Sequence, residues 1–283
     1  MSTDRTLVVG AGYTGKRLLE RLDDAVALSR SAAAGSNQSQ RVDLDADDDA
    51  VIASEPGDRV VYTVPPARDA DQDLRLERFL DRLAAATRRF VYLSTSGVYG
   101  NHDGAVVTED TPVNPSTDRA RRRVAAEATL EQWCTANNTD LVILRVPGIY
   151  GPGRLGADRL AAGTSAIREA DAGPGNRIHV DDLVSCCIAA LAPSVPSGAY
   201  NVGDGDHRSS TWFLEEVARQ AGLPPPATVS REEALRTFSP MRLSFLNESR
   251  RVDVSRMRDV LRPGLAFANP AEGIAASLAA EEA

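Results

Sequence analysis

Three glycines near the N-terminus have the spacing that binds the phosphates of a dinucleotide. Gly10, Gly12 and Gly15 form a GxGxxG pattern that follows an apolar run and precedes an apolar helical stripe. Gly10 permits a tight turn, Gly12 lets the backbone approach a pyrophosphate, and Gly15 allows close packing of helix on strand. Tyr13 and Thr14 open the helix, whose N-terminal N–H groups face the phosphate charge. This context favours dinucleotide binding over a glycine turn without a ligand.

The end of the second predicted strand bears on which dinucleotide is bound. NAD-binding proteins usually carry Asp or Glu there to hold the ribose 2′-hydroxyl. Here the strand ends with Ser29 and Arg30, and a hydroxyl beside a guanidinium suits a 2′-phosphate, so we expect NADP to be preferred, with NAD as the alternative. An exposed loop arginine without a ligand explains Arg30 equally well. Asp43, after a short strand, is placed to meet the adenine edge or to cap the next helix.

Alternating strands and helices must position these residues. Up to about residue 145, short apolar runs alternate with helices that carry one apolar face, which predicts a parallel sheet. The predicted strands are Thr6 to Val9, Ala25 to Leu28, Arg59 to Val64, Phe90 to Ser94 and Leu141 to Leu144. The predicted fold class is α/β, a Rossmann-type doubly wound parallel sheet with a smaller C-terminal substrate lobe.

A change of composition after Pro147 predicts a second lobe. The stretch that follows is rich in Gly and Pro, which a core strand does not tolerate. An apolar helix then indicates a return to the sheet before the lobe resumes. We therefore expect residues 1–147 and 178–203 to form the dinucleotide-binding domain, and residues 148–177 and 204–283 the small substrate-binding lobe.

Composition excludes several classes of function. The net charge of −8 opposes binding to nucleic acid, which needs a basic face. No apolar run is long enough for a membrane span, and no targeting segment is visible. Three Cys without metal-ligand spacing predict no metal site, no disulfide framework and a reducing, cytoplasmic location.

The order of several motifs resembles a known enzyme superfamily over nearly the whole chain. The motifs are GAGYTG at 10–15, YLSTSGVYG at 92–100, EDTPVNP at 109–115, RVPGIYGPGR at 145–154, RIHVDDLV at 177–184 and YNVGDG at 200–205. Together they resemble the extended short-chain dehydrogenase/reductase superfamily, in its NAD-dependent epimerase/dehydratase group. The resemblance implies a nicotinamide cofactor, oxidoreductase-type chemistry and a small-molecule substrate. A homodimer joined by two helices is common in that family.

The resemblance also implies catalytic positions, and this chain departs from one of them. The family's catalytic Ser or Thr at the end of the fifth strand falls on Thr95, with Ser96 beside it, although such hydroxyls also satisfy backbone groups in turns. The family's Tyr-x-x-x-Lys pair, aligned on Glu127, falls on Arg119 and Arg123. A guanidinium stays protonated and cannot act as the acid/base. A solvated charged helix face, with Arg123 and Glu127 paired, is the plain alternative.

Further site residues follow from the same resemblance. Pro147 and Gly148 are expected to meet the nicotinamide carboxamide. Arg154 and Arg177 border the crossing into the second lobe and would clamp an anion, although surface ion pairing explains each of them singly. Two more side chains in cleft-facing family motifs are expected to contact the substrate: Tyr99 and His179.

Two hypotheses about function remain open. The first is an NAD(P)-binding epimerase/dehydratase-like or reductase-like enzyme that acts on a small polar substrate such as a nucleotide sugar. The second is a non-catalytic dinucleotide-binding sensor or scaffold. Arg119 and Arg123 favour the second, whereas Thr95 and the full second lobe favour the first.

Overall fold

A seven-stranded parallel sheet forms the centre of the molecule. A computed structural model describes residues 5–31, 39–46, 48–67 and 72–282 of the chain. The sheet has the order β11-β7-β5-β4-β1-β2-β3, and every neighbouring pair is parallel. Its strands are β1 (Thr6–Val9), β2 (Ala25–Ser29), β3 (Ser39–Arg41), β4 (Arg59–Tyr62), β5 (Arg89–Thr95), β7 (Asp140–Val146) and β11 (Gly198–Asn201). The predicted α/β fold of Rossmann type is confirmed.

The strand order reverses beside β1. From β1 the chain first builds outward through β2 and β3, and then returns to add β4 and the following strands on the other side. In open sheets of this kind, ligands bind beyond the carboxyl ends of the strands at such a reversal. The glycine turn follows β1 at this position, so the fold brings the predicted dinucleotide turn to the expected crevice.

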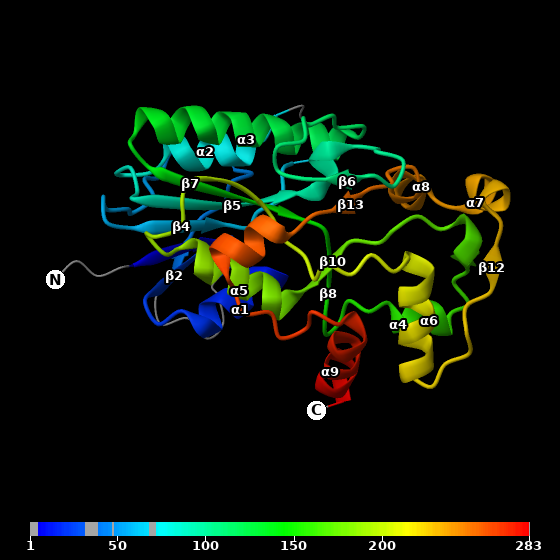
Figure 1. Ribbon diagram of the computed structural model, residues 1–283. Helices are drawn as coiled ribbons and strands as arrows, with labels where there is room; N and C mark the ends of the chain where they lie inside the picture. Colours follow the sequence, from blue (N-terminus) through cyan, green and yellow to red (C-terminus); the bar gives the residue numbers. More distant parts are fainter. Residues whose placement is uncertain (1–4, 32–38, 47, 68–71, 283) are drawn as a thin grey trace.

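Helices cover both faces of the sheet. On one face lie α1 (Tyr13–Arg21) and α5 (Val180–Ala190), and on the other lie α2 (Leu74–Asp81) and α3 (Asp118–Ala136) (Figure 1). Within β1, Val8 packs in the core beneath α1 and α5, and Leu7 packs in the core beneath α2 and α3. Because both faces of the central strands are buried, these strands are apolar at consecutive positions, which is the pattern that identified them in the sequence. The edge strand β3 is polar and mostly exposed.

A smaller group of elements lies to one side of the sheet (Figure 1). Leu160, Val217 and Ile274 belong to a separate apolar cluster within it. Its elements are α4 (Ala157–Ala161), β9 (Ala166–Ile167), η2 (Glu169–Asp171), α6 (Ser210–Gln220), β12 (Thr228–Val229), α7 (Arg231–Thr237), α8 (Pro240–Leu246) and α9 (Pro270–Glu282). The connecting elements are η1 (Ser96–Tyr99), β6 (Val106–Val107), β8 (Gly148–Tyr150), β10 (Arg177–His179), β13 (Arg251–Val252) and η3 (Met257–Leu261).

Part of the C-terminal region packs with the sheet. Val254, Met257 and Leu261 lie in the core beneath α1 and α5, whereas the sequence-based division placed 204–283 in the lobe. An apolar residue pattern alone does not say against which core it packs, so the division of the chain remains a prediction. Among the described helices, none combines the length and the apolar character needed to cross a membrane.

Candidate functional site

The glycine turn after β1 is packed tightly on one side and open on the other. A Cβ added at Gly15 would lie 1.8 Å from the Gly10 carbonyl oxygen, so helix α1 can approach the turn only with glycine there. Thr63 holds the turn from the neighbouring strand end, because its hydroxyl donates to the Gly10 oxygen at 2.9 Å. A Cβ added at Gly12 would have no atom within 4 Å. The open space lies where the sequence places the pyrophosphate.

The N-terminus of α1 supplies donors beside this space. The helix begins at Tyr13, and its first turn contains no acidic residue. The earliest N–H groups of a helix have no partner within the helix, so those of Tyr13, Thr14 and Gly15 are available to an anion. The Lys16 N–H is the first to bond back, to the Gly12 oxygen at 2.9 Å. The turn therefore fits the pyrophosphate of a dinucleotide.

Tyr13 connects the glycine turn to the start of the second lobe. Its hydroxyl donates to the Pro152 oxygen at 2.9 Å, and the Arg154 guanidinium carbon lies 3.8 Å from the centre of its ring. Arg154 also lines a cleft of about 420 Å³ together with Arg159 and Glu281. Two residues predicted for different ligands, Tyr13 for the cofactor and Arg154 for the substrate, are thus in direct contact.

On the adenine side of the site, the three residues predicted to bind the dinucleotide each contact another group of the chain. Ser29 ends β2, and its hydroxyl donates to the Ser31 oxygen. Arg30 lies 3.4 Å from the Asp45 carboxylate, measured from Nη1 to Oδ2. The Asp43 carboxylate accepts the Asp45 N–H at 3.0 Å, so it stabilises a turn. In the described chain the next helix is α2, which Asp73 caps, so the helix-capping alternative for Asp43 is wrong.

Thr95 and Ser96 lie at the carboxyl end of β5, beside the crevice. Thr95 is half-buried, and its hydroxyl oxygen accepts the Gly97 N–H at 3.1 Å, which caps η1. Ser96 is buried. The threonine therefore makes the backbone contact expected of a turn residue, in the place where the family resemblance implies substrate contact.

Arg119 and Arg123 both lie on α3, but they differ in their surroundings. Arg119 is exposed in the first turn of the helix. Arg123 reaches inward and donates from Nη1 to the Tyr92 hydroxyl at 2.8 Å. Burial raises the pKa of Tyr92 to about 12 even with this guanidinium beside it. The alternative in which Arg123 pairs with Glu127 is not what the structure shows, because Arg123 contacts Tyr92 and Glu127 pairs with Arg145 in the core.

Glu127 belongs to a buried polar network that the sequence did not reveal. Its carboxylate accepts from Arg145 Nη2 at 2.8 Å and also from the Ser94 hydroxyl. Arg145 Nη1 donates to the Tyr99 hydroxyl at 3.0 Å, and that hydroxyl donates to Asn201 Oδ1 at 2.7 Å. Tyr99, predicted to contact the substrate, is fully buried here and joins η1 to β7 and β11.

Residues at the lobe crossing also form hydrogen bonds with other groups of the chain. Gly148 N–H donates to the Asn176 oxygen at 3.3 Å and pairs β8 with β10. Arg177 is buried, and its guanidinium bonds to Asp206 Oδ1 at 3.2 Å and to the Ser209 oxygen at 3.1 Å. The Arg177 guanidinium, which was predicted to bind an anion, therefore binds groups of its own chain. These contacts connect β10 to the loop after β11.

His179 connects α5 to α9. Its Nδ1 accepts the Asp181 N–H at 3.2 Å, so the ring proton is assigned to Nε2, which lies 3.1 Å from the Ser277 hydroxyl. Burial lowers the pKa of His179. The residue is only 1% exposed, so this predicted substrate contact lies inside the molecule.

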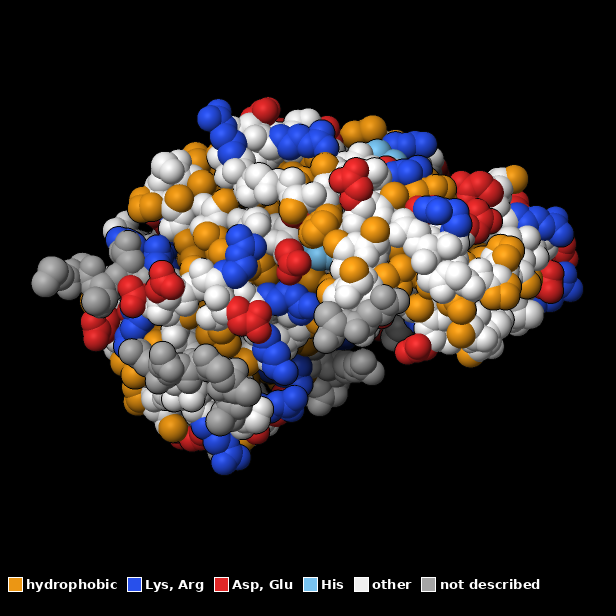
Figure 2. Space-filling view, turned by 90° about the horizontal axis from the view of Figure 1, so that it is seen from below, with side chains coloured by type: hydrophobic (Ala, Val, Ile, Leu, Met, Phe, Trp, Pro, Cys, Tyr) orange, Lys and Arg blue, Asp and Glu red, His pale blue; other side chains and the backbone are white. Residues whose placement is uncertain are grey.

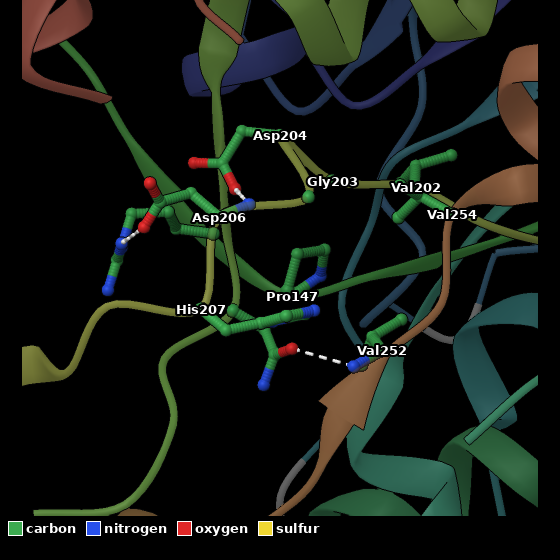
Figure 3. A pocket seen from close by; sticks show the side chains of 11 residues that line it. Pro147, Val202, Gly203, Asp204, Asp206, His207, Val252 and Val254 are labelled. Atoms are coloured by element: carbon green, nitrogen blue, oxygen red, sulfur yellow. Dashed lines mark hydrogen bonds and ion pairs between the residues drawn. The ribbon is translucent and has the colours of Figure 1, made fainter. Parts of the chain in front are cut away.

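Asp204 is a buried acid next to Pro147. Both residues line a cavity of about 10 Å³, roughly the size of one water molecule, with Asp204 and Asp206 on one side of it and Val202 and Val254 on another (Figure 3). Asp204 Oδ1 accepts the Asp206 N–H at 2.8 Å, whereas Oδ2 has no partner among the described residues. Burial raises the pKa of Asp204 to about 7, against a smaller opposing effect of Arg177.

We expect Asp204→Asn to stabilise the protein at pH 8 by on the order of 1–3 kcal/mol. A carboxyl whose pKa is raised on folding stabilises the fold fully below its unfolded pKa of about 3.9, and this stabilisation is lost as the pH rises through about 7. The gain should therefore vanish near pH 4. Urea unfolding of both proteins across this range measures it, and an equal gain at every pH would contradict the assignment.

Comparison with known proteins agrees with this geometry. A family model described as NAD dependent epimerase/dehydratase family matches residues 6–203. Protein YeeZ of Escherichia coli (strain K12) is 32% identical over 190 residues, which are 65% of this chain and 66% of that protein. UDP-glucose 4-epimerase of Mycolicibacterium smegmatis is 31% identical over 205 residues, 68% of this chain and 61% of that protein. The matches thus span less than two thirds of either relative.

A solved structure extends the similarity to the full length. A conserved protein of unknown function from Silicibacter pomeroyi shares 31% sequence identity with a TM-score of 0.82, and the match covers 99% of this chain and 100% of that one. The small lobe and the C-terminal helix are therefore included in the likeness. None of these comparisons supports the predicted preference for NADP.

Proposed function

This chain belongs to the NAD dependent epimerase/dehydratase family, and from that premise we propose that it binds NAD at the glycine turn and acts on a small polar substrate of the nucleotide-sugar class. The observation that carries the proposal is the open space at Gly12 beside the N-terminus of α1. A bound nicotinamide supplies hydride exchange. The chain's own contribution is to hold the pyrophosphate with backbone N–H groups and to place Thr95 at the reacting edge of the sheet.

The substrate class is supported by the cleft at the lobe crossing. Arg154 and Arg159 line this cleft, and guanidinium groups pair well with phosphates. A relative that is 31% identical carries the name UDP-glucose 4-epimerase. On the face formed by α1 and α5, Lys and Arg side chains gather near the middle among Asp and Glu side chains (Figure 2), so this acidic chain presents positive charge on part of that face.

We expect Gly12→Asp to abolish dinucleotide binding in a folded protein. The space at Gly12 admits a side chain, so the fold should persist, but a carboxylate there repels the pyrophosphate. Calorimetric titration with NAD measures the loss. Gly12→Asn is the matched control, because it fills similar space without charge and should retain more affinity. Unchanged NAD affinity in Gly12→Asp would remove the cofactor assignment.

A non-catalytic dinucleotide-binding sensor is the second candidate function. It is favoured by the arginines at 119 and 123, and by Tyr99 and His179, whose polar atoms are engaged inside the molecule. A thermal-shift screen with NAD, NADP and nucleotide sugars, followed by a turnover assay with each stabilising ligand, separates the two. Stabilisation without turnover supports the sensor, and turnover supports the enzyme.

A further inference from the structure

The carboxyl ends of the first three strands lie side by side. Gly10 N–H donates to the Leu28 oxygen at 2.8 Å, and Val42 N–H donates to the Ser29 oxygen at 2.9 Å. The glycine turn, Arg30 and the segment after β3 therefore meet at one edge of the sheet. In dinucleotide-binding sheets, this edge receives the ribose of the adenosine half. Residues at this edge decide between a 2′-hydroxyl and a 2′-phosphate.

One carboxylate at this edge is held in a fixed position. Asp45 Oδ1 accepts from Arg75 Nε at 2.5 Å, and Oδ2 accepts from Arg75 Nη2 at 2.8 Å. Arg75 also donates from Nη1 to the Pro65 oxygen at 2.9 Å, so it is anchored to the loop after β4. The turn closed by Asp43 fixes the backbone of Asp45. Asp45 is thus oriented before any ligand binds.

The same carboxylate faces Arg30. The distance from Arg30 Nη1 to Asp45 Oδ2 is 3.4 Å, and the Arg30 side chain is 71% exposed. The hydrogen bond from Arg75, with the further positive charges of Arg30 and Arg78, lowers the pKa of Asp45, so it remains ionised. Arg30 therefore has a negatively charged neighbour, which the expectation of NADP from Ser29 and Arg30 did not include.

Resting on the proposed NAD site, we propose that Asp45 is the residue that sets a preference for NAD over NADP. The carboxylate that a second strand usually supplies is absent at Ser29 and Arg30, and Asp45, in the loop after β3, brings a carboxylate within 3.4 Å of the Arg30 guanidinium. A ribose 2′-hydroxyl can donate to this carboxylate, whereas a 2′-phosphate is repelled by it. Arg30 is the countercharge that Asp45 holds, and it becomes the phosphate-binding group only when Asp45 is removed.

The test is calorimetric titration of the full chain and its Asp45→Asn variant with NAD and NADP. We expect the parent to bind NAD at least about tenfold more tightly than NADP, and Asp45→Asn to reduce this ratio by about tenfold. Asp45→Glu should keep the preference for NAD. Adding Arg30→Gln to Asp45→Asn should remove the gained NADP affinity, since no guanidinium then faces the 2′-phosphate.

Asp48→Asn is the matched control, because Asp48 also pairs with an arginine of the α2 region, Arg82, at 3.2 Å. It should leave the NAD to NADP ratio within about twofold. A parent that prefers NADP, or an unchanged ratio in Asp45→Asn with NAD still bound, would overturn the role of Asp45. Failure of the parent to bind either dinucleotide would instead overturn the proposed function, and this inference with it.

Discussion

Replacing Arg145 with methionine is expected to destabilise the fold by about 3–5 kcal/mol, because the change leaves Glu127 buried without its counter-ion. The two side chains are only 10% and 7% exposed, so water cannot replace the lost partner. The Tyr99 hydroxyl would lose a donor at the same time. Chemical unfolding monitored by circular dichroism measures the change in the free energy of unfolding.

A second variant separates the ion pair from the rest of the network. Arg145→Met combined with Glu127→Leu removes both charges and should cost much less than Arg145→Met alone, because no buried charge then lacks a partner. Arg236→Met is a matched control, since Arg236 pairs with Glu232 at 2.7 Å on an exposed helix face, and it should change stability by no more than about 0.5 kcal/mol. Equal losses in Arg145→Met and Arg236→Met would show that burial does not govern these pairs.

Local patterns in the sequence were sufficient to predict the central strands of the sheet and the dinucleotide turn. The apolar run Thr6 to Val9 followed by three spaced glycines specifies a strand, a turn and a helix within about 20 residues. The structure forms β1 and α1 from this segment, with Gly15 packed against Gly10 as its spacing implies. Buried parallel strands are apolar on both faces, which made them visible without knowledge of their partners.

Pairings between distant elements could not be predicted in the same way. In the sequence, Glu127 cannot be distinguished from the other charged residues of its helix. Only the packing of α3 against β7 brings it to Arg145. Arg30 likewise reads as a loop arginine, and its contact with Asp45 depends on how the strand ends align. Tyr99 and His179 lie in motifs that suggest a cleft, but the cores that enclose them are formed by several segments. Charge and burial at one position depend on tertiary contacts that no local window contains.

The second large effect that we expect concerns the rate of carbonyl reduction, which depends on the residues at two positions of α3. The family resemblance implies that a Tyr with a Lys four residues later exchanges the proton during hydride transfer, and alignment on Glu127 predicts these positions at Arg119 and Arg123 in this chain. A guanidinium remains protonated at working pH and neither donates nor accepts that proton. Tyr92, the phenol that Arg123 contacts, is fully buried, and this burial raises the pKa of Tyr92 to about 12. We therefore do not expect Tyr92 to act as the acid/base in place of the family's tyrosine.

We expect the parent protein to show no NADH-dependent reduction of simple carbonyl compounds above the uncatalysed rate, and Arg119→Tyr with Arg123→Lys to produce such activity. Positions 119 and 123 are one helical turn apart, so the new ammonium lies near the new phenol and lowers its pKa. Well-placed acid/base catalysis contributes about 100-fold or more. Thr95→Ala in this double variant should remove the gain, because we predict that Thr95 orients the substrate oxygen. Loss of NADH absorbance gives the steady-state rates.

The control places the same residue types elsewhere on α3. Arg121→Tyr with Arg122→Lys adds one phenol and one ammonium on neighbouring positions of the helix, away from the family's catalytic spacing, and should remain inactive. NAD titration of every variant shows that the cofactor still binds, so a missing rate reports on chemistry. Brisk carbonyl reduction by the parent, unaffected by Thr95→Ala, would show that proton transfer here does not need the Tyr-Lys pair and that Thr95 does not orient the reacting oxygen.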